Sequence, residues 1–337
     1  MAARPVDASV LRAQVTRIFE RLGLPNSDAT IVAEHLVEAD LRGVHSHGVI
    51  RVPTYVSSCQ SGTINPHPNI RIVTDNGGQV VVDGDNAIGQ LAAFRANEIA
   101  IERGKVHGMA AVALRQSNHC GTMAYYAVRA IPHGLIGYAT TNAGINMTPT
   151  GGTVKLVGNN PFAIAIPTNR DWPMVLDMAT SVVAGGKLDV ARSKGESIPL
   201  GWARDAQGKP TTDPSAARQG SLDPLGGPKG YGMAIMLDVL SGVLSGGRFG
   251  AGLGAPGSAQ FFMTIDVTQF QPLEEFKARM DQMIDQLHAC PRGPGVDRIY
   301  IAGEIENDLQ TRREKDGVPI EESVLAELDK VTASLGA

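Results

Sequence analysis

Two short segments of the chain concentrate side chains that could carry out chemistry. The first runs from Arg42 to Arg51 (RGVHSHGVIR), and the second from Ser117 to Gly121 (SNHCG). An arginine can hold a carboxylate in two hydrogen bonds and stays charged at any working pH. A histidine titrates near neutrality, which suits proton transfer. Together the segments predict a site that binds a carboxylate and moves a proton beside it.

In the first segment, His47 and Arg51 are spaced so that either backbone conformation brings them near each other. In a helix they lie one turn apart on one face, and in an extended segment they point to the same side. Gly43 and Gly48 leave the backbone free to turn the side chains between them inward. A solvated loop with a histidine at a helix end would explain the same residues equally well.

In the second segment, His119 follows a predicted strand and precedes a predicted helix. Such turns carry functional groups in many α/β proteins. The alternative is a histidine that only forms a hydrogen bond at the start of a helix. The neighbouring Cys120 is expected to pack in the core, because no separate activating group accompanies it.

Hydrophobic periodicity indicates the elements that position these segments. Apolar stripes predict a helical hairpin over residues 7–43, and Asn76-Gly77 predicts a β-hairpin. Strands and helices then alternate, so we expect an α/β or α+β architecture with a separate helical element. Further helices are expected over 88–103, 122–131, 181–193, 229–244 and 273–287 and after Glu304, and strands over 70–74, 80–82, 109–114, 135–140, 162–167, 174–176 and 260–267.

Composition excludes several classes of protein. The 337 residues suffice for two domains, and a net charge of -4 without a long run of one sign argues against a nucleic-acid partner. Three cysteines far apart in sequence predict neither disulfides nor a metal site. No apolar run has the length of a signal peptide or a membrane span. We therefore expect a cytoplasmic protein without a membrane partner.

A bound dinucleotide is the second expectation, although the familiar fingerprint is absent. Gly252–Gly257 matches Gly-x-Gly-x-x-Gly, but it follows a glycine-rich loop and runs into a strand, so a standard Rossmann fold is not expected. Several other stretches could bind a dinucleotide. Each one alone is also explained as a capped helix start or a turn. Taken together, they favour a bound nucleotide. These stretches are Gly151-Gly152, Gly158–Pro161, Asp177–Ser181 and Gly226–Gly232.

The residues at this point resemble the malate/L-lactate dehydrogenase family that lacks a Rossmann fold. Its members include ureidoglycolate, sulfolactate and diketogulonate dehydrogenases and cyclic-imine reductases. The similarity covers nearly the whole chain in the family's order. The matching blocks are 45–49 with Arg51, 117–119 with Gly121, Thr141-Asn142, Pro149 with 151–152, 158–161, 177–181, 198–199 with 201–203, 228–232, and Gly303-Glu304 with Glu306 and Arg312.

The resemblance implies that NAD or NADP binds in a non-Rossmann α/β domain with a mixed sheet, packed against a mainly helical domain. It also implies a homodimer. We expect the helical domain over residues 1–75, with 290–337 packing back on it, and the dinucleotide-binding domain over 76–289. No acidic residue stands at the position that reads the ribose in the Rossmann fingerprint, so NAD and NADP are not distinguished.

Residue roles also follow from the resemblance. His119 is implied as the proton acceptor, with His47 as its partner or substitute, since different relatives assign the proton to different histidines. Ser46 and Arg51 would orient the substrate carboxylate, and Asn142 would line the substrate pocket. The implied cofactor contacts are Thr141, Asp177, Met178, Ala179, Lys229, Gly303 and Glu304.

The implied reaction is hydride transfer between the nicotinamide and a small 2-hydroxy or 2-oxo acid of the malate or L-lactate type. The alternatives are a reductase of cyclic imine or ketimine carboxylates, a ureidoglycolate-type dehydrogenase, and a nucleotide-binding protein without catalysis. The chain departs from the family at 142–150, where bulky proline-tryptophan versions are common, and at 249–259, which is short and glycine-rich. The first departure leaves the substrate least determined.

Overall fold

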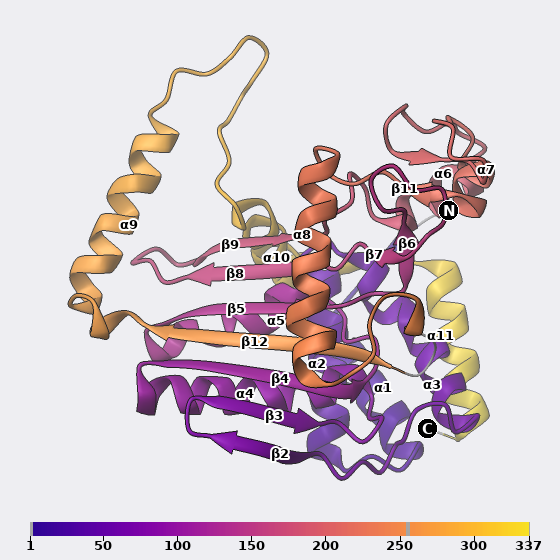
Figure 1. Cartoon of the computed structure of the whole chain (residues 1–337). Helices are drawn as coiled ribbons and strands as arrows, with labels where there is room; N and C mark the ends of the chain where they lie inside the picture. Colours follow the sequence, from indigo (N-terminus) through magenta and orange to yellow (C-terminus); the bar gives the residue numbers. More distant parts are fainter. Residues whose placement is uncertain (1–2, 254–256, 337) are drawn as a thin grey trace.

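The computed structural model describes residues 3–253 and 257–336, and its centre is a seven-stranded sheet (Figure 1). The strand order is β2-β3-β4-β12-β5-β8-β9, with β3 and β4 parallel and every other pair antiparallel. The mixed α/β fold is therefore confirmed. The strands are β2 (Arg71–Asn76), β3 (Gln79–Asp83), β4 (Met109–Ser117), β5 (Leu135–Thr141), β8 (Phe162–Ile166), β9 (Met174–Met178) and β12 (Ser258–Asp266).

The position of β12 explains how distant segments meet. This late strand lies between β4 and β5, and Gln260 faces both Leu114 and Thr141. Because β12 is antiparallel to both neighbours, the carboxyl ends of β4 and β5 lie at the same end of the sheet, on either side of β12. The loops that follow these two strands, which begin at Asn118 and Asn142, therefore leave the sheet at the same end.

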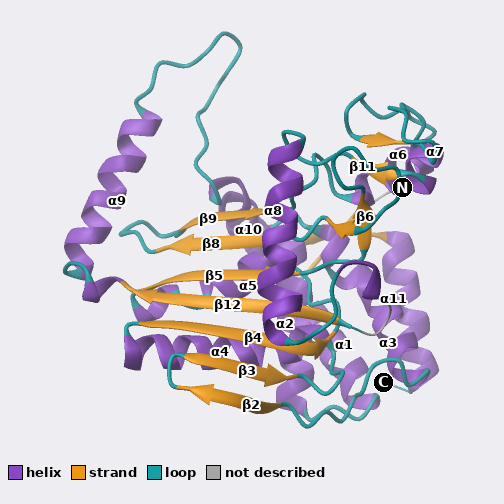
Figure 2. Cartoon of the chain, viewed as in Figure 1, coloured by secondary structure: helices purple, strands orange, loops and turns teal. Residues whose placement is uncertain are grey.

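Helices cover one face of this sheet closely. The helix α4 (Gly89–His107) presents fully buried alanines, including Ala92, Ala96 and Ala100, to the buried side chains of β4. These small side chains allow close packing of helix and sheet. The short helix α5 (Met123–Val128) lies on the same face, whereas α8 (Pro228–Asp238) crosses the opposite face (Figure 2).

A second core joins both ends of the chain. The helices α1 (Ala8–Arg21), α2 (Asn26–Leu41) and α3 (Val52–Gln60) bury their apolar faces together with residues of the C-terminal helix α11 (Glu322–Leu335). The strand β1 (Ala3–Val6) pairs with β13 (Val318–Glu321), which separates α10 (Glu304–Asp316) from α11. The predicted helical hairpin and helical tail are confirmed. The four-residue strands β1 and β13 carry too little periodicity to be predicted from sequence.

The third part is a small lobe with its own core. It contains short strands, β6 (Ile145–Met147), β7 (Val157–Gly158), β10 (Ala203–Arg204) and β11 (Ser221–Leu222), and the helices α6 (Gly185–Lys194) and α7 (Pro214–Gln219). Outside this lobe, α8 continues into a π-helical turn over Val239–Val243. The helix α9 (Leu273–His288) stands away from the sheet and leads into a long loop (Figure 1).

Some predicted boundaries differ from the structure. Asn76 pairs with Gln79, so Gly77 and Gly78 form the hairpin turn, one residue later than predicted, and Gly77 has a φ of 75° that suits glycine. The helix predicted from Ser181 begins only at Gly185, because Ser181 instead bridges to Pro224. The expected domain boundary after residue 75 lies inside β2, all of which belongs to the large sheet.

The glycine-rich string at 252–257 is only partly described. Residues 254–256 lie outside the described residues, Gly252 ends a 3-10 turn, and the predicted strand begins at Ser258. Across residues 3–253 and 257–336, no helix combines the length and apolarity needed to span a membrane.

Candidate active site

Residues from both sequence segments, 42–51 and 117–121, line one cavity of about 860 Å³. It lies where the loops after α2, β4 and β5 meet the segment that precedes α10. Its size falls in the range of about 300–1,000 Å³ that is typical of small-molecule and cofactor sites. Among its lining residues are Ser46, His47, Arg51, His119, Thr141, Asn142, Asp177, Met178, Ala179 and Gly303.

The first segment is shaped by Asp40. Its buried carboxylate accepts hydrogen bonds from the Val49 backbone N–H at 2.7 Å and from Nδ1 of His45 at 2.7 Å. A Cβ on Gly48 would overlap this carboxyl group, which explains the glycine there. The chain consequently forms two 3-10 turns, over His45–His47 and Val49–Arg51. His45 is thereby held at Asp40, and His47 is free to line the cavity.

The polar side chains of these turns are locked together. Nδ1 of His47 lies 2.8 Å from Oγ of Ser46, and Nε of Arg51 donates to the Ser46 carbonyl oxygen at 2.6 Å. Burial, and then the positive charge of Arg51, lower the pKa of His47 to about 4. No carboxylate among the described residues pairs with Arg51, so its terminal guanidinium nitrogens are available to an acid in the cavity.

His119 stands beside His47 in the same cavity. The two ring centroids are 5.3 Å apart with an interplanar angle of 25°. Nδ1 of His119 lies 2.6 Å from the hydroxyl of Tyr55. Burial and the nearby His47, Arg51 and His35 lower the pKa of His119 to about 3, although the open cavity lets solvent reach the ring. Both imidazoles are therefore neutral at pH 7 and can accept a proton.

The residues expected to contact the cofactor form another part of the wall. Oδ2 of Asp177 accepts a hydrogen bond from the Ala124 backbone N–H at 2.9 Å, near the start of α5. Desolvation by the surrounding protein raises the pKa of Asp177 to about 6, although the residue is open to the cavity. Thr141 donates from Oγ1 to the Asn142 carbonyl oxygen at 2.9 Å. A large cavity with backbone segments and a weakly acidic carboxyl in its wall suits a ligand much larger than malate.

Three residues with expected ligand contacts, Asn142, Lys229 and Glu304, either bond within the protein or lie outside the cavity lining. The side chain of Asn142 donates to Asp238 and to the Arg248 carbonyl and accepts from the Ala259 N–H, so it is fully used within the protein. Lys229 is exposed at the start of α8, and it is not among the residues that line the cavity.

Glu304 is buried and does not line the cavity either. It accepts from the Ile301 N–H at 2.9 Å and bonds to Arg298 and to Nε2 of His288. These bonds hold the end of the loop between α9 and α10. The residues of that loop that do line the cavity are Tyr300–Gly303.

Sequence reasoning missed Tyr55 and Gln90, which support His119 from behind. Tyr55 follows Arg51 by one helical turn, so the helical spacing used for His47 and Arg51 could have found it. No comparable signal marks Gln90, which arrives from α4. Glu306, Asp189 and Arg218 also line the cavity and were not anticipated.

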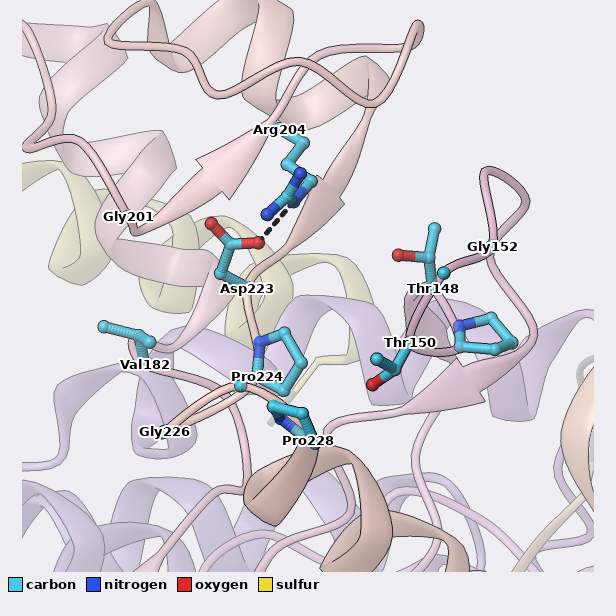
Figure 3. Close-up of a pocket in the computed structure, with 13 residues that line it drawn as sticks. Thr148, Thr150, Gly152, Val182, Gly201, Arg204, Asp223, Pro224, Gly226 and Pro228 are labelled. Atoms are coloured by element: carbon cyan, nitrogen blue, oxygen red, sulfur yellow. Dashed lines mark hydrogen bonds and ion pairs between the residues drawn. The ribbon is translucent and has the colours of Figure 1, made fainter.

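A second pocket of about 630 Å³ lies between the small lobe and the start of α8 (Figure 3). An ion pair between Arg204 and Asp223 at 2.7 Å forms one side, and Thr148 and Thr150 face it from the other. The stretch 142–150 thus lines both the cavity and this pocket. Its first residues line the cavity, and its last residues line the pocket.

Comparison with known proteins adds to this geometry. Residues 6–329 match the malate/L-lactate dehydrogenase family. Malate dehydrogenase of Pyrococcus horikoshii is 43% identical over 335 residues, which cover 96% of this chain and 93% of that one. Its solved structure superposes with a TM-score of 0.93 and 38% identity, covering 99% of this chain and 96% of the other.

Two further relatives have other activities. L-sulfolactate dehydrogenase of Methanocaldococcus jannaschii is 38% identical over 328 residues, covering 95% of this chain and 94% of that one. The structure of delta1-piperideine-2-carboxylate reductase from Pseudomonas syringae has a TM-score of 0.87 at 28% identity, covering 97% of this chain and 99% of the other. The chain belongs to the malate/L-lactate dehydrogenase family.

Family membership confirms the predicted enzyme class. The protein is an oxidoreductase that acts on a CH–OH group, and the family implies a nicotinamide cofactor. The resemblance noted in the sequence is confirmed, and so is the non-Rossmann α/β fold.

Proposed function

We propose that the protein transfers a hydride between NAD or NADP and the C2 atom of a small 2-hydroxy or 2-oxo acid of the malate or L-lactate type. One observation carries the proposal: the imidazoles of His119 and His47 lie 5.3 Å apart in a single cavity that Arg51 also lines. A proton-transfer group and a carboxylate-binding group are thus within reach of one small molecule.

His119 is proposed to take the hydroxyl proton through its cavity-facing nitrogen, Nε2, in the tautomer whose own hydrogen lies on Nδ1. As the O–H bond breaks, the carbonyl C=O bond forms and the C2–H bond is lost with its electron pair. The nicotinamide supplies the acceptor for that hydride when the cofactor is bound. Removing the proton and the hydride together avoids a bare alkoxide. Arg51 holds the carboxylate in two hydrogen bonds and fixes the direction of the C–H bond.

His47 is proposed as the partner of His119 or its substitute. Its ring lies beside that of His119, and the contact between Ser46 and Nδ1 fixes its orientation. With Nδ1 engaged, Nε2 of His47 is the nitrogen left for a ligand. A pair of neutral imidazoles beside one alcohol can share the proton, which explains why His47 is kept neutral by burial and by Arg51.

We place the cofactor along Thr141, Asp177–Ala179 and Gly303, which share the cavity with the histidines. Glu304 supports this wall through the Ile301 N–H. Lys229 stays a candidate for a phosphate contact from the start of α8. NAD and NADP are both proposed, and separate Kd measurements for the two decide between them.

A homodimer is proposed as the functional assembly. Met236, Val239 and Val243 form an exposed apolar stripe along α8 and its π-helical continuation, with the spacing of one helix face. Large apolar side chains in such a row are unusual on the surface of a monomer. We also propose the division into a helical domain (1–75 with 290–337) and a dinucleotide-binding domain (76–289), with β2 counted in the second domain because all of it belongs to the large sheet.

A second candidate function is reduction of a cyclic imine carboxylate, favoured by the structural similarity to delta1-piperideine-2-carboxylate reductase. Such a substrate presents the same carboxylate to Arg51 and takes the hydride at C=N. Turnover of pyruvate, oxaloacetate and piperideine-2-carboxylate, each with NADH and with NADPH, separates the two. Faster turnover of the imine would replace the first proposal, and turnover of none would refute both.

A further inference from the structure

Behind His119, on the side away from the cavity, lie the buried side chains of Tyr55 and Gln90. Tyr55 comes from α3 and is 4% exposed, and Gln90 comes from the first turn of α4 and is fully buried. A Cβ on Gly89 would overlap the backbone of Asn118 and His119, so the absence of a side chain there lets α4 begin directly against the His119 loop. Two helices thus meet at one ring nitrogen.

The hydrogen bonds of this group can be counted. Nε2 of Gln90 donates to the Tyr55 oxygen at 2.9 Å, and that oxygen lies 2.6 Å from Nδ1 of His119. A phenol has a single hydrogen, and among the described residues His119 is its only acceptor. Burial raises the pKa of Tyr55, so the phenol keeps its hydrogen. With the Gln90 amide in this orientation, Nδ1 of His119 accepts, and the hydrogen of the neutral ring sits on Nε2.

The opposite arrangement needs only a turned amide. Oε1 of Gln90 is buried without a hydrogen-bond partner. If the Gln90 amide rotates by half a turn, Oε1 accepts the Tyr55 hydrogen, and the Tyr55 oxygen can accept from a protonated Nδ1. Nε2 of His119 then presents a lone pair to the cavity. The heavy atoms keep their places, and only the amide and the hydrogens differ.

We propose that Tyr55 and Gln90 are positioning residues that determine which ring nitrogen of His119 carries the proton, and thus whether this ring meets a ligand as a donor or as an acceptor. In the ligand-free protein Nε2 carries it. The inference rests on the proposed role of His119, yet it concerns a property of the free protein. It can therefore be measured without substrate or cofactor.

The test is nitrogen NMR of the protein labelled with ¹⁵N-histidine. The His119 signals are assigned as those missing from His119→Asn. In the wild type we expect a protonated Nε2 and an unprotonated Nδ1. Tyr55→Phe removes the donor to Nδ1, and one hydrogen bond changes such an equilibrium by a factor of roughly 2–10. The ratio of the two tautomers should shift by about that factor toward protonated Nδ1.

The sign of the pKa change gives a second readout. A hydrogen bond to the neutral ring disfavours the charged ring, so its loss in Tyr55→Phe should raise the pKa of His119. If Nδ1 instead donated to Tyr55, the same variant would lower that pKa. The other titratable and charged groups near the ring, namely His35, His47 and Arg51, are unchanged in this variant, and so is Cys120, which lies near Tyr55.

Gln90→Met supplies a variant that keeps the tyrosine. Tyr55 can then donate only to His119, so the protonated Nε2 should persist. Asn97→Ala is the matched control, because Asn97 is a buried amide on the same helix that donates to the Tyr126 carbonyl instead. Its His119 signals should equal those of the wild type. Turnover in the reducing direction, which needs a hydrogen on Nε2, should fall by about the same factor of 2–10 in Tyr55→Phe, with an unchanged Kd for the cofactor.

Two results would overturn the inference: unchanged tautomer ratio and pKa in Tyr55→Phe, or a wild-type ring protonated at Nδ1. Failure of the proposed function is a separate outcome. In that case no 2-hydroxy acid, 2-oxo acid or cyclic imine is turned over, while the tautomer signals follow the pattern given above.

Discussion

The ring of His47 stacks on the ring of His119 with 5.3 Å between centroids, although 71 other residues separate them in the chain. One ring is held by Ser46 and the other by Tyr55, so each has one nitrogen engaged on the protein side. The stacked pair defines the place where a proton would enter or leave the ligand.

Replacing His119 by asparagine should lower kcat by roughly 10²–10⁴-fold, the usual contribution of a positioned acid or base. The cofactor Kd, measured by fluorescence titration, should stay within a factor of two to three. His133→Asn is the control, because His133 is exposed and far from the cavity lining. Full activity in His119→Asn would contradict the proposed role and leave His47 as the proton-transfer group.

Arg51→Lys tests the carboxylate site. A point charge cannot reproduce the two parallel hydrogen bonds of a guanidinium. We expect the KM for the acid to rise about tenfold or more, with little change in the KM for the cofactor. Arg71→Lys, at an exposed arginine in β2, is the comparison. A selective loss of cofactor affinity in Arg51→Lys would place this residue in the other half of the site.

Stability should depend on pH through three histidines, His35 in the core and His47 and His119 in the cavity wall. The pKa values of His35 and His119 are lowered to about 3 and that of His47 to about 4, mainly by burial. Between these values and the ordinary 6.5, the unfolded chain binds more protons than the folded one. The contribution of these histidines to the free energy of unfolding should therefore be complete above pH 6.5 and be lost as the pH drops toward 4.

Three carboxyl groups, those of Asp177, Glu38 and Asp40, oppose this trend, because burial raises the pKa of each. The pKa of Asp177 is raised to about 6, so its contribution to stability is lost as the pH rises through that value. Urea unfolding at pH 7, 6, 5 and 4.5 measures the slope, and the double variant His47→Asn/His119→Asn should flatten it. A slope unchanged in that variant would show that these rings are not neutral in the folded protein.

Gly48→Ala tests the loop that carries Ser46 and His47. The added Cβ would overlap the Asp40 carboxyl, so the turns must shift and the free energy of unfolding should fall by about 1–3 kcal/mol. Activity should fall as well, because His47 moves with the turn. Asp40→Ala/Gly48→Ala removes the overlap, and the two substitutions should then be less than additive in a double-mutant cycle. Strict additivity would argue against the contact.

The α8 stripe should be the contact between subunits. Met236→Asp introduces a charge in the middle of the exposed apolar row, and we expect it to yield monomers in light scattering of the eluted protein. Met109→Asp, at an exposed methionine at the start of β4, is the control and should leave the mass unchanged. A wild type that elutes as a monomer would refute the assembly.

The sequence alone was sufficient for most helices and strands and for the two chemical segments. Periodicity reports which face of an element is buried, and residue types report which groups can bind a carboxylate or titrate. His47, Arg51 and His119 could be named on these grounds. The family resemblance added the nicotinamide cofactor and the expected roles of the site residues.

Only the tertiary structure determined which residues from distant parts of the chain become neighbours. The insertion of β12 between β4 and β5 brings the His119 and Asn142 loops to one end of the sheet, and that pairing joins residues more than a hundred positions apart. The same folding turned Asn142 into a structural amide and placed Tyr55 and Gln90 behind His119. Local sequence determines the elements, because their forces act over a few residues. The partners of each side chain depend on how distant elements pack.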